Sequence, residues 1–162
     1  MINQVYWCTG TPGRPKAFDQ GIEATIGGGT KGDLLMITGP LGLRYSGRLV
    51  PRMEMGEIAV NDPPTPYRVK RWLDLAPRVG GDIFLKLYTH GAREDNADTL
   101  LGTATKPSGL LQMFQWLHEA AQERQIELHW ASAYEMFCAV EALTQGIAAV
   151  SEKPVASSRG AR

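Results

Sequence analysis

Hydrophobic positions are densest between Asp82 and Gly91, where the sequence reads DIFLKLYTHG. The front half is a continuous apolar run between a glycine pair and a polar loop, a pattern typical of a buried central strand. Because strand side chains alternate between faces, one face should be purely apolar and the other should carry Phe84, Lys86, Tyr88 and His90. The second face therefore brings polar groups to the carboxyl end of the strand, where α/β proteins place their sites.

Other runs rich in β-forming residues predict further strands. These are residues 4–9, residues 33–38, a short extended piece within 18–26, and residues 126–130, where Ile126, Leu128 and Trp130 alternate. A hairpin is expected from residues 41–45 and 48–50, folding around Ser46 and Gly47.

Three helices follow from apolar residues at helical spacing. The first begins at Thr65 and Pro66, ends at Pro77 and buries Val69, Trp72, Leu73 and Ala76. The second runs from Ser108 to about Arg124 and buries Leu110, Phe114, Leu117 and Ala121. The third opens with a capping box between Ser132 and Glu135, stops at Gly146 and buries Met136, Ala139, Val140 and Leu143.

From Thr65 onward the expected order is helix, strand, loop, helix, strand, helix. This alternation predicts an α/β fold with parallel strands, as a sheet or a barrel segment, after a β-rich irregular N-terminal part. Residues 92–107 read as a long, polar connection. A single domain should span residues 1–150, followed by a small, polar and disordered tail at 151–162.

Composition narrows the function classes. The 162 residues are 43% hydrophobic, and 17 basic residues balance 17 acidic ones. Without a basic patch, nucleic acid is not an expected partner. No apolar span or leader predicts a membrane helix or a signal peptide, so the cytoplasm is the default compartment. Cys8 and Cys138 are too few for a disulfide scaffold or a zinc knuckle.

The glycine-rich run from Gly27 to Gly32 resembles a phosphate loop only superficially. A P-loop requires Gly-Lys-Ser/Thr in that order, and here Lys31 precedes Gly32. A loop or hairpin turn is the expected structure.

His90 is the first candidate for catalysis, although a lone histidine at a strand end is more often a structural hydrogen-bonding group. Lys86 must either reach a sheet edge or find a partner, because a buried unpaired ammonium is too costly. Tyr88 and Asp95 are the other candidate substrate-binding residues. His118 lies off the apolar stripe of its helix and is expected at the surface.

The runs IFLKLYTHGA, GLLQMFQWLHEAAQERQ, IELHWA and SAYEMFCAVEAL resemble the last third of a polysaccharide deacetylase, the NodB-homology domain. The likeness covers about residues 3–146, because VYWCTGTPGRPKAFDQG, GDLLMITGPLGL and NDPPTPYRVKRW are similar to uncharacterised deacetylase-like bacterial proteins. It implies the C-terminal part of a distorted (β/α) barrel. A late strand of that family ends in Leu-x-His, here Leu87 to His90 with one extra residue. In the subgroup the motif is Lys-Leu-His-Thr-His-Gly, from which Tyr88 departs.

The resemblance implies metal-assisted hydrolysis of N-acetyl or O-acetyl groups on a carbohydrate polymer, acting on carbon–nitrogen bonds other than peptide bonds in the first case. His90 would be the general acid, and Lys86 or Tyr88 would orient it or contact sugar. The family binds a divalent metal such as zinc through an Asp-Asp pair and a His-x-x-x-His motif, and this sequence has neither. No cofactor is therefore expected in this chain.

Since a complete barrel needs about 250 residues, the resemblance implies a C-terminal portion that is inactive alone. An exposed apolar surface is then expected, covered by a second copy of the chain or by a missing N-terminal segment. The alternative is a non-catalytic carbohydrate-binding or partner-binding domain. Its sugar platform would be one of the aromatic side chains Tyr6, Trp7, Trp72 or Trp130.

Overall fold

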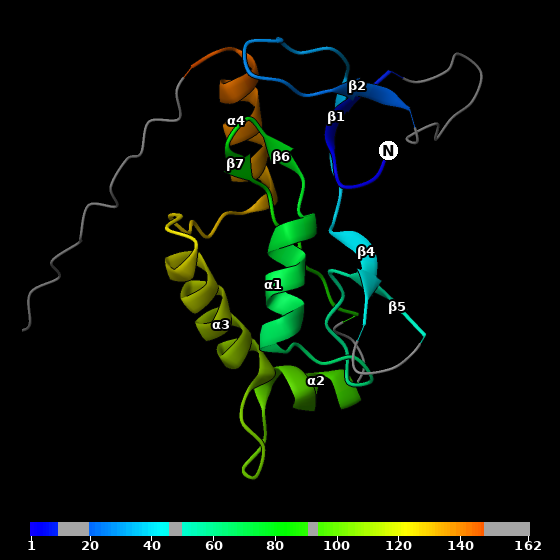
Figure 1. Ribbon diagram of the computed structural model, residues 1–162, viewed down its shortest axis with the longest axis vertical. Helices are drawn as coiled ribbons and strands as arrows, with labels where there is room; N and C mark the ends of the chain where they lie inside the picture. Colours follow the sequence, from blue (N-terminus) through cyan, green and yellow to red (C-terminus); the bar gives the residue numbers. More distant parts are fainter. Residues whose placement is uncertain (10–19, 46–49, 91–93, 148–162) are drawn as a thin grey trace, which may run out of the picture.

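Strand β1 (Val5–Cys8) is the centre of a three-stranded antiparallel sheet, between β2 (Gly21–Glu23) and β3 (Leu34–Ile37) (Figure 1). The structure is a computed structural model that describes residues 1–9, 20–45, 50–90 and 94–147. Helix α4 (Ala133–Thr144) lies beside this sheet. Together they bury the sheet core, made of Val5, Trp7, Ala24, Val79, Phe84, Val140 and Leu143.

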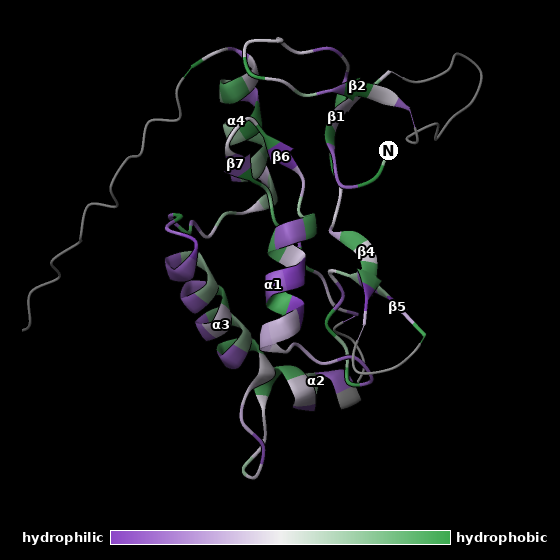
Figure 2. Ribbon diagram, in the orientation of Figure 1, coloured by the Kyte–Doolittle hydropathy of each residue, from purple (hydrophilic) through white to green (hydrophobic). Residues whose placement is uncertain are grey.

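A second cluster lies around helix α1 (Pro66–Leu75), which Figure 1 shows between α3 (Gly109–Glu123) and the hairpin of β4 (Leu41–Arg44) and β5 (Arg52–Met55). Helix α2 (Glu94–Leu101) packs against the start of α3. Figure 2 shows the hydrophilic and hydrophobic residues of α3 on opposite sides. The helix core consists of Ile58, Val69, Trp72, Leu73, Leu100, Met113, Leu117 and Ala120.

The two cores share one connecting segment. After α1 the chain forms a small hairpin from β6 (Arg78–Val79) and β7 (Asp82–Ile83). Phe84 then enters the sheet core, whereas Leu85 and Leu87 pack against the helix core. This segment therefore ties the two halves of the fold together.

Residues Gly27–Gly29 close the C-terminal end of α4. Gly27 N–H donates to the Leu143 carbonyl at 3.0 Å, and Gly29 N–H donates to the Thr144 carbonyl at 2.7 Å. Both glycines have positive φ, which lets them turn without the strain a side chain would suffer. The glycine-rich loop is thus confirmed as a turn, and two of its N–H groups donate hydrogen bonds to the last carbonyl groups of α4.

The predicted helices are confirmed with their caps. Thr65 accepts from the Arg68 N–H, and the capping box between Ser132 and Glu135 is formed in both directions. Gly146 has φ 74° and follows α4 as expected. All four residues expected to be buried by α1 are buried. In α3 the buried side chains include Met113 and Ala120, whereas Phe114 is exposed, so the predicted stripe was offset.

The expected parallel barrel segment is wrong. Among the described residues the named strands pair only antiparallel, in three small sheets. The expected central strand is regular only at β7, and residues 84–90 continue as an extended segment with one parallel bridge between Glu57 and Tyr88. It is not buried on both faces, because Lys86, Tyr88 and His90 are exposed while Phe84 is buried.

Two further expectations fail for local reasons. Residues 126–130 form no strand, because Gln125 adopts φ 56° and the Ile126 N–H caps α3 by donating to the Ala121 carbonyl at 3.0 Å. The long connection expected over residues 92–107 contains helix α2. The predicted turn at Ser46 and Gly47 and the predicted tail at 151–162 lie outside the described residues.

Candidate functional site

Residues 86–88 lie unusually close to the end of β5. Tyr88 N–H donates to the Gly56 carbonyl at 2.9 Å, and Ile58 N–H donates to the Tyr88 carbonyl at 2.9 Å. A Cβ at Gly56 would lie 2.6 Å from the Lys86 carbonyl oxygen, so only glycine permits this approach. The pairing places the side chain of Tyr88 beside the residues that follow β5.

The cluster formed by Glu57, Tyr88 and His90 is the candidate site. His90 Nε2 lies 3.7 Å from Glu57 Oε1, too far for a hydrogen bond but close enough for an ion pair when the imidazole is protonated. The Tyr88 and His90 rings meet edge to face, with centroids 6.0 Å apart. The His90 side chain is 73% exposed, so a ligand from solvent can reach it.

The Tyr88 side chain lies close to Met55 and Glu57. Its hydroxyl lies 3.2 Å from the Met55 sulfur. Partial burial, and then the negative charge of Glu57, raise the pKa of Tyr88 above its ordinary value. The phenol is therefore a hydrogen-bond donor throughout the neutral range.

Asn96 holds the backbone of His90 in place. This residue of α2 is buried; its Nδ2 donates to the His90 carbonyl at 3.0 Å, and its Oδ1 accepts from the Val60 N–H at 2.9 Å. The Asn96 side chain therefore links the backbone at Val60, three residues after Glu57, to the backbone at His90.

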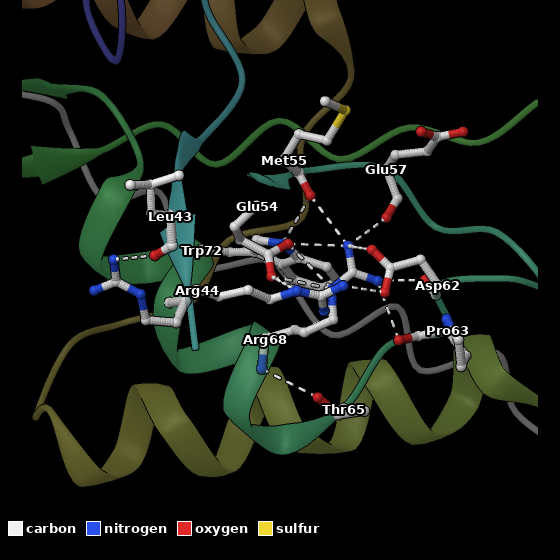
Figure 3. Close-up of polar contacts among 11 residues, drawn as sticks. Leu43, Arg44, Glu54, Met55, Glu57, Asp62, Pro63, Thr65, Arg68 and Trp72 are labelled. Carbon is white, nitrogen blue, oxygen red and sulfur yellow. Dashed lines mark hydrogen bonds and ion pairs between the residues drawn. The ribbon is translucent and has the colours of Figure 1, made fainter. Parts of the chain in front are cut away.

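A largely buried ion cluster of Arg44, Glu54, Asp62 and Arg68 lies next to the backbone of Glu57 (Figure 3). Arg68 Nη2 donates to Glu54 Oε1 at 2.9 Å and to the Glu57 carbonyl at 2.8 Å. Trp72 Nε1 also donates to Glu54 Oε1, at 2.8 Å. Figure 3 shows the Glu57 carbonyl directed at Arg68 and its carboxylate pointing away, so the cluster fixes the backbone from which Glu57 faces His90.

The ion cluster is electrically balanced, with two guanidinium groups and two carboxylates. Arg68 and Glu54 are almost fully buried. Arg44 Nε lies 3.3 Å from Glu54 Oε2 without forming a hydrogen bond, so this contact is electrostatic alone, whereas Arg44 Nη2 donates a hydrogen bond to Asp62 Oδ1. Such a set of compensated buried charges fits a structural role better than a ligand site.

The structure brings Tyr88 and His90 together but leaves the other candidates apart. Lys86 is exposed on the same segment but lies outside any strand, so its ammonium is neither buried nor at a sheet edge. Asp95 lies in α2, and its side chain is outside the described residues. His118 is exposed, as expected. Within the described part of the chain, no group of three or more histidine, cysteine or acidic residues could hold a metal ion.

Glu57 is the site residue that sequence reasoning missed. The sequence patterns predicted no element around Glu57, and this residue pairs with His90, 33 positions further along the sequence. Asn96 belongs to a polar stretch that, from its position after His90, could line a polar cleft, although a solvated loop was the expected structure for most of it. Only the apolar residues following it, Leu100 and Leu101, signalled a helix there.

Comparison of the chain with models of protein families, with curated proteins and with solved structures gives no match. The resemblance to the polysaccharide deacetylases therefore rests on the sequence motifs. No helix among the described residues is long and apolar enough to cross a membrane.

Proposed function

We propose that this chain supplies the general-acid part of a carbohydrate deacylation site, with His90 as the acid. The observation that carries the proposal is the pairing of an exposed imidazole with a carboxylate, His90 with Glu57, on a surface open to a polymer. Glu57 would attract the protonated imidazole and hold it in place. His90 would then pass its proton to the departing amine or alcohol of the sugar.

Tyr88 and Lys86 extend this surface on the same segment. The Tyr88 hydroxyl, whose proton is directed at the Met55 sulfur, would accept a hydrogen bond from a sugar hydroxyl. Lys86 would attract an anionic or carbonyl-bearing part of the glycan. The side chains of Lys86, Tyr88 and His90 are all exposed at alternate positions of one segment, which would let them contact the same ligand.

The described residues do not fit a bound divalent metal, since they contain no suitable group of ligands. The activated water of a deacetylase is therefore not assigned to them, and we expect the purified chain to show no turnover of acetylated chito-oligosaccharide, with or without added zinc. Turnover that disappears in His90→Ala would contradict the expected inactivity.

Binding tests the assignment directly. Chito-oligosaccharides with and without acetyl groups would be titrated into the full chain while the imidazole signals are followed by NMR. We expect the His90 signals to shift, and His90→Ala and Glu57→Gln to weaken binding at least about tenfold, a loss of about 1.4 kcal/mol. His129→Ala, another exposed histidine beside a glutamate, is the matched control and should bind as the wild type does.

One observation favours a second candidate, a non-catalytic sugar platform at Trp130. Of the four aromatic residues considered, Tyr6, Trp7 and Trp72 are buried and cannot offer a ring face. Trp130 is 55% exposed, and its ring contacts Phe114 and His118 with centroids 4.8 and 5.9 Å away. An indole supported in this way can stack on a pyranose ring.

The same titration separates the two candidates. Loss of glycan binding in Trp130→Ala together with normal binding in His90→Ala would replace the deacylation site by the platform. The reverse pattern would support His90. Binding by neither surface would reject both.

A further inference from the structure

The Met55 thioether is the hydrogen-bond partner of the Tyr88 hydroxyl. The hydroxyl donates to the Met55 sulfur, with the two atoms 3.2 Å apart. Met55 is the last residue of β5, and Figure 3 shows its sulfur pointing away from the ion cluster. A thioether sulfur is a weak hydrogen-bond acceptor. The orientation of the Tyr88 hydroxyl therefore depends on the chemical state of one sulfur atom.

The backbones on both sides of this contact are fixed. The Met55 carbonyl accepts from Trp72 Nε1 at 3.0 Å and from Arg68 Nη2 at 3.2 Å. The N–H and the carbonyl of Tyr88 each form a backbone hydrogen bond of 2.9 Å. Neither residue can shift its backbone without breaking these hydrogen bonds. A group added to the Met55 sulfur must therefore be accommodated by the side chains of Met55 and Tyr88.

Met55 is accessible to small oxidants. The residue is half-buried, and the neighbouring Tyr88 is 40% exposed, whereas Met113 lies in the helix core. Met53, two positions earlier in β5, is 61% exposed. Oxidants convert methionine to methionine sulfoxide, a polar side chain. Met53 and Met55 are therefore both open to oxidation, and the sulfur of Met55 contacts a residue of the candidate site.

We propose that Met55 is an oxidation site at which a peroxide displaces the Tyr88 hydroxyl. The sulfur gives an electron pair to one peroxide oxygen, the O–O bond breaks and an S–O bond forms. The second oxygen leaves in water when the oxidant is hydrogen peroxide. Sulfur thus loses two electrons, and the peroxide gains two. The effect on sugar binding rests on the function proposed for Tyr88.

The sulfoxide changes the surroundings of Tyr88 in two ways. Its oxygen is polar and holds the phenol proton more strongly than the weakly accepting thioether does. The oxygen also needs space beside a hydroxyl that already contacts the sulfur, so the phenol must move. Tyr88 then leaves the position in which it accepts a hydrogen bond from sugar. A methionine sulfoxide reductase, which removes the oxygen as water with electrons from a pair of thiols, reverses the change.

The test compares Met53→Leu and Met55→Leu, each in the full chain, before and after treatment with hydrogen peroxide. Leucine has nearly the volume of methionine, so both variants should fold. In Met53→Leu we expect a sulfoxide at Met55 by mass spectrometry and a shift of the Tyr88 ring signals in the NMR spectrum. Binding of chito-oligosaccharide should weaken about three- to tenfold, which corresponds to one lost hydrogen bond. Sulfoxide reductase should restore the signals and the binding, and peroxide should change neither in Met55→Leu.

Three outcomes would overturn the proposal. These are a Met55 that stays reduced while Met53 is oxidised in the wild type, Tyr88 signals that stay in place when Met55 is oxidised, and an equal response in Met55→Leu. Wild-type spectra cover the case in which a variant fails to fold, because the Tyr88 shift should follow the oxidised fraction of Met55 and not that of Met53. If the Tyr88 signals shift while binding is absent or unchanged, the function proposed for Tyr88 is rejected and the oxidation site is supported.

Discussion

Glu54 is the residue on which most of the polar interior depends. Its fully buried carboxylate accepts hydrogen bonds from Arg68 and Trp72 and forms an ion pair with Arg44. Four charges from four separate segments cancel there, so the removal of one leaves an uncompensated charge in the interior. The free energy cost of that residual charge, rather than the strength of any single contact, determines how much a substitution in the ion cluster destabilises the protein.

Glu54→Ala is therefore expected to lower the free energy of unfolding by about 3–5 kcal/mol. Chemical denaturation followed by tryptophan fluorescence measures the loss. Glu123→Ala is the matched control, since its ion pair with Lys70 is exposed and should contribute no more than about 1 kcal/mol. Equal losses in the two variants would show that the buried cluster does not stabilise the fold.

A substitution at Asn96 tests whether its hydrogen bond to the His90 carbonyl positions the imidazole. Asn96→Ala removes a donor to the His90 carbonyl and an acceptor for the Val60 N–H, which should cost about 1–3 kcal/mol of stability. We also expect the imidazole signals of His90 to shift in the NMR spectrum, because the peptide that carries the ring loses its anchor. The signals of His118 and His129 should stay where they are. Unchanged His90 signals in a folded variant would rule out this positioning role.

At the scale of elements, the sequence predicted features whose interacting residues lie close together in the chain and missed those whose partners lie far apart. The helix starts at Thr65 and Ser132 were predictable, because a cap and its partner lie three residues apart. Glu54 and Arg68 are fourteen residues apart, and neither has a local signal for burial. The apolar alternation of residues 126–130 was read as a strand, yet Gln125 turns the chain there to finish α3. Local chemistry fixed the helix ends, whereas tertiary contacts decided the strands.

The capping box of α4 makes stability depend on pH. The hydrogen bonds with Ser132, first through its backbone N–H and then through its side chain, lower the pKa of Glu135 below its ordinary value. A carboxyl with a lowered folded-state pKa contributes stability that is present above the unfolded-state pKa and lost as the pH falls through the folded-state pKa. Below about pH 4.5 the wild type should lose this contribution.

Glu135→Gln keeps a side-chain oxygen that can accept the Ser132 N–H but does not titrate. The difference in unfolding temperature between wild type and variant should therefore be constant from pH 6 to 5 and shrink below about pH 4.5. Thermal unfolding followed by circular dichroism gives that difference. A difference that stays constant across the acid range would mean that Glu135 does not act through its charge.

At the scale of the whole molecule, the connecting segment 84–87 determines whether the two cores behave as one unit. Phe84 enters the sheet core, and its N–H donates to the Pro77 carbonyl at 2.9 Å, while Leu85 and Leu87 pack against the helix core. Alternate side chains of one extended segment thus serve both clusters. Loss of packing at Phe84 should free the segment and weaken both halves together.

We expect Phe84→Ala to cost about 3–5 kcal/mol and to speed amide hydrogen exchange in α1 as well as in α4. Leu143→Ala is the matched control, because Leu143 belongs to the sheet core alone and sits at the far end of α4. It should cost about 2–5 kcal/mol, with its largest local effect on α4 and the β1–β3 sheet. If exchange in α1 is unaffected by Phe84→Ala while α4 opens, the two cores unfold separately, and residues 84–87 act as a linker between them.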